Sequence, residues 1–84
     1  MTYRIRFTKQ AEKDIHKLSP KLQAKLKDIL RNRIAVSPHA GKPLVGELKG
    51  HYSARLSYQD RIVYTIREDE LVVMVIRART HYGD

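Results

Sequence analysis

The 84-residue chain contains no cysteine, so a disulfide framework and any metal site built on thiolates are excluded. The four histidines show no spacing typical of a metal site, such as His-Glu-x-x-His on a helix. The N-terminal residues lack the apolar stretch of a signal peptide, and no apolar run approaches the ~20 residues that span a bilayer. We therefore expect a cytoplasmic protein with no cofactor, no metal and no contact with a membrane.

Acidic residues are scarce. Nine aspartates and glutamates face 17 lysines and arginines, which gives a net charge of +8 and a pI near 10.1. A charge balance of this kind attracts phosphate polymers, so the composition predicts a partner made of nucleic acid. The length predicts one domain, residues 1–84, that buries only roughly 60–65% of its unfolded surface. A partner that covers apolar surface would therefore stabilise it further.

The first half of the chain predicts one strand and two helices. Apolar and basic residues alternate over residues 3–7, which is the period of a strand with one buried face. Thr8 is a candidate N-cap for the first helix. Ser19 and Pro20 are typical of the N-cap and first position of a second helix, whose apolar stripe runs over residues 22–34.

The second half predicts a long loop and three strands. Proline and glycine punctuate residues 37–50, and strands are expected at residues 51–57, 61–67 and 71–79. The expected fold is α+β with the order β-α-α-β-β-β. A helical hairpin would pack on one face of a mainly antiparallel four-stranded sheet.

Alternation along the three last strands assigns their two faces. The face expected beneath the helices is apolar: Tyr52, Ala54, Leu56, Ile62, Tyr64, Ile66, Val72, Met74, Ile76 and Ala78. The opposite face carries Ser53, Arg55, Ser57, Arg61, Val63, Thr65, Val73, Val75, Arg77, Arg79 and His81. This parity predicts an arginine-rich open face, and a register shift of one residue would reverse it.

The residues of this open face suit the cleavage of RNA without a metal. That reaction requires a base for the 2′-OH proton, a cation for the charge on phosphorus and an acid for the departing 5′ oxygen. Arg55, Arg61, Arg77 and Arg79 can supply guanidinium groups, whose fork of donors matches phosphate, although any one arginine on a strand is more often simply solvated. Arg61 begins an otherwise apolar strand and is the preferred cation. His81 is the natural acid because histidine titrates near neutral pH.

Four more residues are candidates for the site. Glu47, at the edge of the long loop, is the carboxylate best placed to act as the base. Tyr82 and Tyr58 could stack on bases of single-stranded RNA. His51, at the start of a strand, is either a phosphate contact or a residue without a role.

Several short motifs, in their order and spacing, resemble the RelE/ParE toxin superfamily of bacterial toxin-antitoxin pairs, and its YoeB/Txe and RelE branches most of all. The likeness covers essentially the whole chain. The motifs are Leu48-Lys49-Gly50, Tyr52-Ser53-Ala54-Arg55, Asp60-Arg61-Ile62-Val63-Tyr64 and the terminal His81-Tyr82.

The resemblance implies a RelE-like microbial ribonuclease fold and an mRNA interferase that cuts mRNA in the A site of the 70S ribosome, beside the 16S rRNA. It also implies a cognate antitoxin protein that silences the toxin. By the same likeness Arg61 is the transition-state arginine, Arg79 a second phosphate ligand and His81 the general acid. Tyr82 would help to hold the substrate, and Arg55 lies where relatives place a lysine or arginine.

The sequence departs from the YoeB pattern in the loop. Those enzymes place a catalytic glutamate after Lys-Pro, whereas here Lys42-Pro43 is followed by Leu44. Either Glu47 has taken that role or the base is a lysine such as Lys49, as in RelE-like sites.

Two other functions remain open on the sequence. One is a ParE-like inhibitor of DNA gyrase, and the other is a basic module that binds RNA or ribosomes without chemistry. ParE-like relatives generally lack the His-Tyr end, which favours the nuclease.

Overall fold

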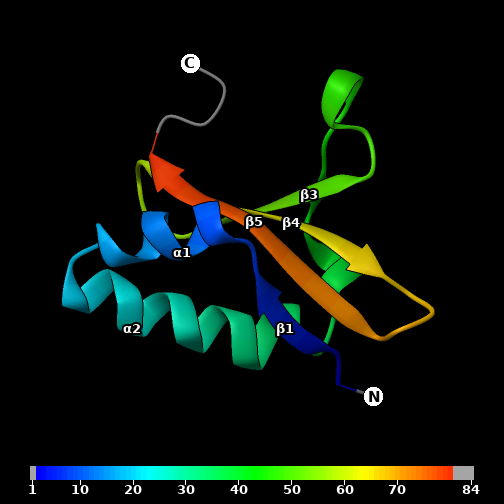
Figure 1. Ribbon diagram of the computed structural model, residues 1–84, viewed down its shortest axis with the longest axis horizontal. Helices are drawn as coiled ribbons and strands as arrows, with labels where there is room; N and C mark the ends of the chain where they lie inside the picture. Colours follow the sequence, from blue (N-terminus) through cyan, green and yellow to red (C-terminus); the bar gives the residue numbers. More distant parts are fainter. Residues whose placement is uncertain (1, 81–84) are drawn as a thin grey trace.

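Two helices cover one face of a five-stranded mixed sheet in the computed structural model, which describes residues 2–80 (Figure 1). The strand order is β1-β5-β4-β3-β2. β1 pairs with β5 in parallel and every other pair is antiparallel. The elements are β1 (Arg4–Phe7), α1 (Lys9–His16), α2 (Pro20–Ile29), β2 (Lys42–Pro43), β3 (His51–Arg55), β4 (Asp60–Arg67) and β5 (Val72–Thr80). The expected α+β class, element order and helical hairpin are confirmed.

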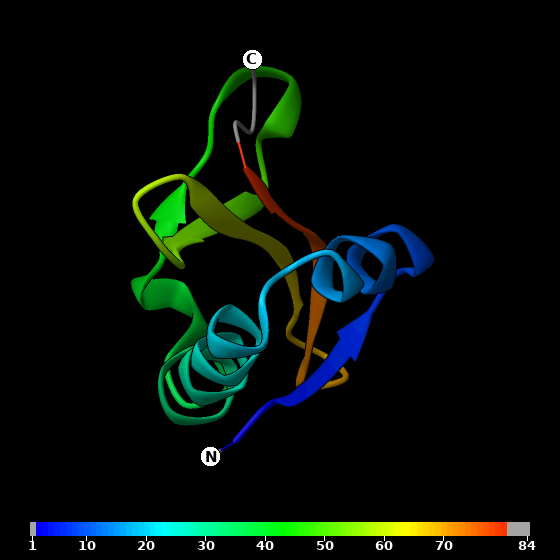
Figure 2. The ribbon, with the colours of Figure 1, turned by 90° about the vertical axis from the view of Figure 1, so that its left-hand side faces the viewer.

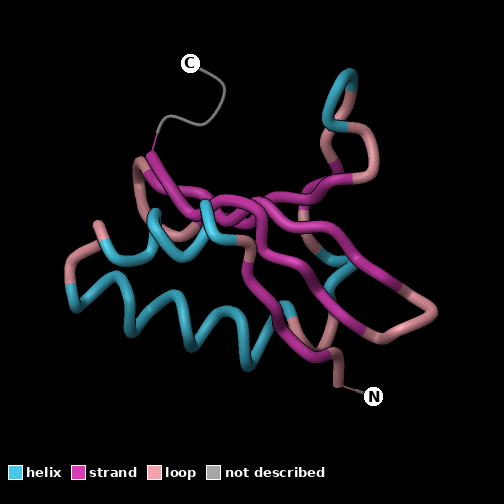
Figure 3. The backbone as a smooth tube through the Cα atoms, viewed as in Figure 1, coloured by secondary structure: helices cyan, strands magenta, loops and turns pink. Residues whose placement is uncertain are grey.

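Both helices begin at the predicted caps. The Thr8 side chain accepts a hydrogen bond from the Ala11 N–H at 3.1 Å, and Ser19 accepts one from the Leu22 N–H at 3.2 Å. Each bond satisfies a donor that a helix start leaves unpaired. α2 then widens into a π-helical turn, Leu30–Ile34, which continues the apolar stripe to Ile34. Figure 3 shows the two helices as an antiparallel hairpin beneath the strands.

The core lies between the helices and the nearer face of the sheet. Leu26, Ile29 and Leu30 from α2 and its extension meet Ile62 and Tyr64 of β4. The predicted core side of β3 and β4 is confirmed, because Tyr52, Ala54, Leu56, Ile62, Tyr64 and Ile66 all belong to this core or pack against it. The opposite side is less open than predicted, since Ser53 and Val63 are buried there.

The predicted face of β5 is wrong over its first half. Val73 and Val75, expected on the open face, belong to the core, and Val72 and Met74 alternate with them onto the other side. The cause is a bulge. Val63 pairs with Arg77 but Tyr64 pairs with Val75, so Ile76 is an extra residue that reverses the parity before it. At Arg77 and Ala78 the predicted parity holds, with Ala78 buried and Arg77 partly exposed.

Two further expectations need correction. The sheet has five strands rather than four, because Lys42–Pro43 pairs with β3 inside the segment expected to be a loop. Pro43 is tolerated there since β2 is an edge strand, where a missing N–H costs no pairing on the outer side. Phe7, expected on a buried face, remains 40% exposed because β1 forms the other edge of the sheet.

Tyr64 holds the segment before β2 against the core. Its hydroxyl donates a hydrogen bond to the Pro38 carbonyl at 2.7 Å, and its ring stacks on Tyr52 with centroids 5.8 Å apart. Burial raises the pKa of the Tyr64 hydroxyl to about 12, which keeps it a donor at neutral pH. A Cβ at Gly41 would lie 2.1 Å from the Tyr64 oxygen, so only glycine permits this close approach.

We predict that Gly41→Ala lowers the free energy of unfolding by about 1–3 kcal/mol, the usual cost of overpacking. Urea denaturation of the wild type, Gly41→Ala, Tyr64→Phe and the double variant measures the coupling. Gly41→Ala should cost less in the Tyr64→Phe background, because the nearest atom is then absent. An equal cost in both backgrounds would contradict the steric explanation.

Candidate functional site

Three neighbouring strands bring three arginines into one row across the open face. Arg55 of β3 pairs directly with Arg61 of β4, and Arg61 pairs with Arg79 of β5. We call these three residues the arginine row. Adjacent strands lie about 4.8 Å apart, and like charges directly opposite one another destabilise a sheet. Arg55 and Arg61 therefore bring like charges to directly opposite positions of β3 and β4, which costs stability.

The β3–β4 turn fixes the position of Arg61 within this row. The Ser57 hydroxyl donates to the Asp60 carboxylate at 2.8 Å and accepts from the Asp60 N–H at 3.0 Å. The N–H groups of Leu56 and Ser57 both donate to the Asp60 carbonyl. Arg61, half-buried, follows this closed turn directly, so its backbone is held where β4 begins.

Arg77, a predicted phosphate ligand, is held by a carboxylate that the sequence analysis did not single out. Its Nε donates to the Asp14 carboxylate of α1 at 2.9 Å. The same carboxylate oxygen accepts from the Ala78 N–H at 3.1 Å, and the other accepts from the Gln10 side chain at 3.1 Å. Asp14 is therefore a positioning residue for the end of β5, and the interaction occupies one of the donors of Arg77.

The environment of Asp14 favours its ionised form. Burial acts to raise the pKa of this carboxyl, but hydrogen bonds from Arg77, Ala78 and Gln10 and the charge of Arg77 outweigh it and leave the pKa below its usual value. The signal was present in the sequence, because Asp14 lies in the apolar stripe that includes Ala11 and Ile15. A carboxylate in such a stripe needs a partner from elsewhere in the fold.

The loop between β2 and β3 carries both candidate bases. Glu47 lies in a short 3-10 turn, Gly46–Leu48, and Lys49 follows it, and both side chains are exposed. Gly46 and Gly50 adopt φ of +70° and +95°, which other residues rarely adopt. In Figures 1 and 2 this loop and the end of β5 both point toward the top of the view; in Figure 1 they lie on opposite sides of it, and the end of β5 lies beside α1.

The structure separates the two remaining candidates on the open face. Tyr58 lies in the turn that joins β3 to β4 and is 87% exposed. It therefore lies near Arg55 at the end of β3 and Arg61 at the start of β4. His51 lies at the opposite end of β3, about 13 Å along the strand from Arg55. Its Nδ1 is buried and has no hydrogen-bond partner among residues 2–80.

His81 and Tyr82, the predicted acid and substrate clamp, lie outside the described residues. The last described residue of β5, Thr80, pairs with Asp60, one position beyond the pair of Arg61 and Arg79. The chain therefore leaves the described part of the sheet directly beside the arginine row.

Two other kinds of feature are absent from residues 2–80. This part of the chain contains no group of three or more histidine, cysteine, aspartate or glutamate side chains that could hold a metal ion. No helix within it has the length and apolar character needed to cross a membrane.

Comparisons with known proteins agree with the fold. A family model for the YoeB-like toxin of bacterial type II toxin-antitoxin systems matches residues 5–82. Toxin RelG of Mycobacterium tuberculosis is 36% identical over 78 residues, which cover 92% of this chain and 88% of that protein.

Solved structures of similar toxins superpose on most of the chain. The RelBE2 toxin-antitoxin complex of M. tuberculosis contains a chain with a TM-score of 0.87 at 33% identity, covering 96% of this chain and 93% of that one. The YoeB/ParE toxin of Agrobacterium tumefaciens gives a TM-score of 0.83 at 27% identity, covering 94% and 99%.

The fold and the relatives together define a small α+β toxin of the RelE/ParE superfamily. Within it, the chain belongs to the YoeB-like family of toxins of bacterial type II toxin-antitoxin systems.

We predict that Asp14→Asn lowers the free energy of unfolding by about 1–3 kcal/mol at pH 7, because Arg77 loses a charged acceptor. The folded pKa of Asp14 lies below its unfolded value, so the carboxylate stabilises the fold above the unfolded pKa and loses this effect as pH falls through the folded pKa. The difference between wild type and variant should therefore shrink as the solution is acidified below about pH 4.

Urea denaturation at neutral and acidic pH tests this prediction. Glu12→Gln, on the exposed side of the same helix, is the matched control and should change stability by less than about 0.5 kcal/mol. An Asp14→Asn effect no larger than that of the control would contradict the positioning role.

Proposed function

We propose that this toxin is an endoribonuclease that cleaves mRNA on the ribosome, in the A site, and so arrests translation. The observation that carries the proposal is the arginine row, three arginines at mutually paired positions of three strands in a chain of the YoeB-like family. A gyrase inhibitor or a passive RNA-binding module needs neither this pairing of arginines nor the sequence pair His81-Tyr82.

The proposed reaction needs no metal. A base removes the proton from the 2′-OH, and the resulting oxygen attacks the adjacent phosphorus. Arg61 stabilises the charge that builds on the phosphate oxygens, with Arg79 and Arg55 as further phosphate ligands. His81 donates a proton to the departing 5′ oxygen, which leaves a 2′,3′-cyclic phosphate and a 5′-OH. Tyr82 and Tyr58 hold the flanking bases by stacking.

The base comes from the loop between β2 and β3. Glu47 and Lys49 are both exposed there, and neither forms an ion pair with another described residue. A carboxylate is the simpler base, because a lysine must first lose its own proton. His51 lies too far along β3 from Arg55 to share one phosphate with it, and we assign it a contact to a neighbouring nucleotide.

Arg61→Ala should reduce cleavage by about 10²–10³-fold while leaving the fold intact, because it removes a donor to the transition-state charge. Single-turnover cleavage of mRNA on programmed ribosomes, with primer extension to map the cut, measures the effect. Arg67→Ala is the matched control, an exposed arginine on the same strand, about 20 Å farther along it.

Full activity of Arg61→Ala would show that Arg61 does not stabilise the transition state. If the wild-type protein inhibits DNA supercoiling but cuts no mRNA, the result would instead support the hypothesis of a gyrase inhibitor.

Glu47→Gln and Lys49→Ala identify the base. If Glu47 accepts the 2′-OH proton, Glu47→Gln should slow single-turnover cleavage by about 10²-fold or more without weakening mRNA binding. Lys49→Ala should then mainly weaken binding. Rates measured at saturating toxin and binding measured with an uncleavable mRNA separate the two effects, and a normal rate for Glu47→Gln would transfer the role to Lys49.

We further propose that a cognate antitoxin segment docks in the groove between β1 and α2. The groove has volumes of about 300 and 230 Å³ in two adjoining parts that share Phe7, Leu30 and Lys27. Its floor is apolar, Lys27 and Arg31 line its rim, and β1 is an edge strand. An acidic, amphipathic segment matches this chemistry. The structures of RelBE2 from M. tuberculosis and RelBE from Escherichia coli, both toxin-antitoxin complexes, support a partner of this kind.

Phe7→Asp should weaken antitoxin binding by at least about tenfold, because it places a like charge and a polar group on the apolar floor. Val45→Asp, at an exposed site in the loop between β2 and β3, is the control with the same change of charge. Calorimetric titration with the product of the neighbouring reading frame gives the affinities, and the complex should melt above the free toxin. Equal effects of both substitutions would exclude the groove.

A further inference from the structure

We propose that the outer face of α1 is a second phosphate-binding surface, on which the backbone of bound RNA continues beyond the arginine row. The inference rests on the proposed function, since it extends the path of the same substrate. The surface is built on Lys9, Lys13 and Lys17, which we call the lysine row.

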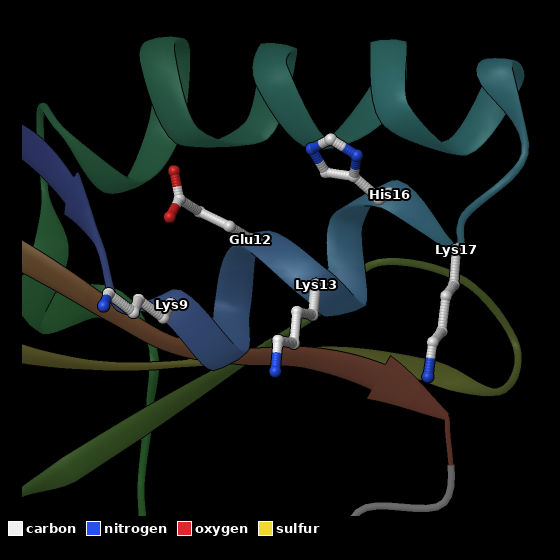
Figure 4. Close-up of a pocket in the computed structure, with 5 residues that line it drawn as sticks. All are labelled: Lys9, Glu12, Lys13, His16 and Lys17. Atoms are coloured by element: carbon white, nitrogen blue, oxygen red, sulfur yellow. The ribbon is translucent and has the colours of Figure 1, made fainter.

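The lysine row has the spacing of a polymer-binding surface. Its members follow one another at intervals of four residues, so they lie on one side of the helix at steps of about 6 Å and extend over about 12 Å. Figure 4 shows all three side chains directed away from α2, toward the side of α1 on which β5 runs in that view. Glu12 and His16 point the other way.

No charge within the described part of the chain compensates the row. None of the three ammonium groups forms an ion pair with another described residue, and all three lysines are exposed. Like charges four residues apart repel one another, and Lys9 in the first turn is opposed by the helix dipole, although Lys13 and Lys17 lie at the C-terminal end, where the dipole favours cations. A phosphate polymer is a counter-charge that the whole row can bind from outside.

The lysine row adjoins the arginine row through one contact. Asp14, next to Lys13 in sequence, accepts a hydrogen bond from Arg77 of β5, so α1 is fastened to the strand that carries Arg79. A backbone that crosses β3, β4 and β5 along the arginine row therefore meets α1 as the next element.

The chemistry of this face favours RNA over an acidic protein. The concavity beside it has a volume of about 640 Å³ and is lined by the three lysines together with Glu12 and His16 of the neighbouring side of α1. No phenylalanine, tyrosine, tryptophan or branched aliphatic side chain lines it, whereas protein partners gain most of their affinity from large anchors of this kind. Binding of a phosphate backbone needs only cations at regular spacing.

The test compares two pairs of lysines with the same spacing and charge. Lys13→Gln with Lys17→Gln alters the row, and Lys21→Gln with Lys25→Gln alters exposed lysines of α2. The probes are fluorescein-labelled 2′-O-methyl RNAs, which lack the attacking hydroxyl: one of ~5 nucleotides that fits the sheet alone, and one several times longer. Fluorescence anisotropy gives the affinity of each as a function of salt.

We expect the first pair to lower affinity for the long RNA on the order of tenfold at about 0.1 M salt. For this variant and the long RNA, the slope of log K against log[salt] should become less negative by about 1.4, which corresponds to the loss of two phosphate contacts at ~0.7 each. The ratio of long-RNA to short-RNA affinity should fall with it, and the α2 pair should leave that ratio unchanged.

Three results would overturn the proposal. The first is that both lysine pairs lower the affinity for the long RNA equally, and the second is that Lys13→Gln with Lys17→Gln leaves the ratio of long-RNA to short-RNA affinity unchanged. The third is that this pair lowers the affinity for the antitoxin without changing the salt slope for RNA. The failure of the proposed function is distinct from these. If the wild-type protein shows the expected salt slopes but does not cut mRNA, the proposed nuclease activity is wrong and the proposed RNA-binding surface on α1 is retained.

Discussion

The hydrogen bonding of β5 along both edges is the constraint on which the candidate site depends. β4 pairs with one edge along the full strand, and β1 pairs with the other only as far as Val75. Beyond that point, side chains of α1 and its N-cap form the hydrogen bonds to this edge of β5. The Thr8 hydroxyl donates to the Ile76 carbonyl, and the Asp14 carboxylate accepts from the Ala78 N–H. Side chains of a helix thus replace a missing strand. Without them the half of β5 that carries Arg77 and Arg79 would be an open edge.

The same arrangement explains how a small fold tolerates its charge. The arginine row places like charges on neighbouring strands, and the lysine row does the same on α1. Arg77, which belongs to neither row, has a buried acidic partner, Asp14. Under the proposed function, binding of RNA would neutralise the charges of the two rows, so the stability of the free protein and its affinity for RNA would oppose each other. The groove proposed for the antitoxin adjoins the lysine row, because Glu12 and His16 line both concavities.

The helices and most of the strands were predictable because they depend on interactions between residues close in sequence and on the burial of one face. Caps at Thr8 and Ser19 act through bonds to residues three positions away, and the alternation along β3 and β4 reflects burial of one face. The arginine row followed from that alternation, because Arg55 and Arg61 keep the parity of strands without a bulge. The bulge at Ile76 was not predictable, since it depends on how β5 meets β4 and the helices at once.

The sequence by itself determined the class of fold, the basic open face and the family to which the motifs belong, because these depend on spacing and composition. Only the tertiary structure decided which face the first half of β5 presents, that Lys42–Pro43 pairs as a fifth strand, and that Asp14 holds Arg77. Each of these is a contact between segments far apart in the chain. Such contacts are selected by packing and hydrogen-bond satisfaction of the whole molecule, which no local pattern of residues records.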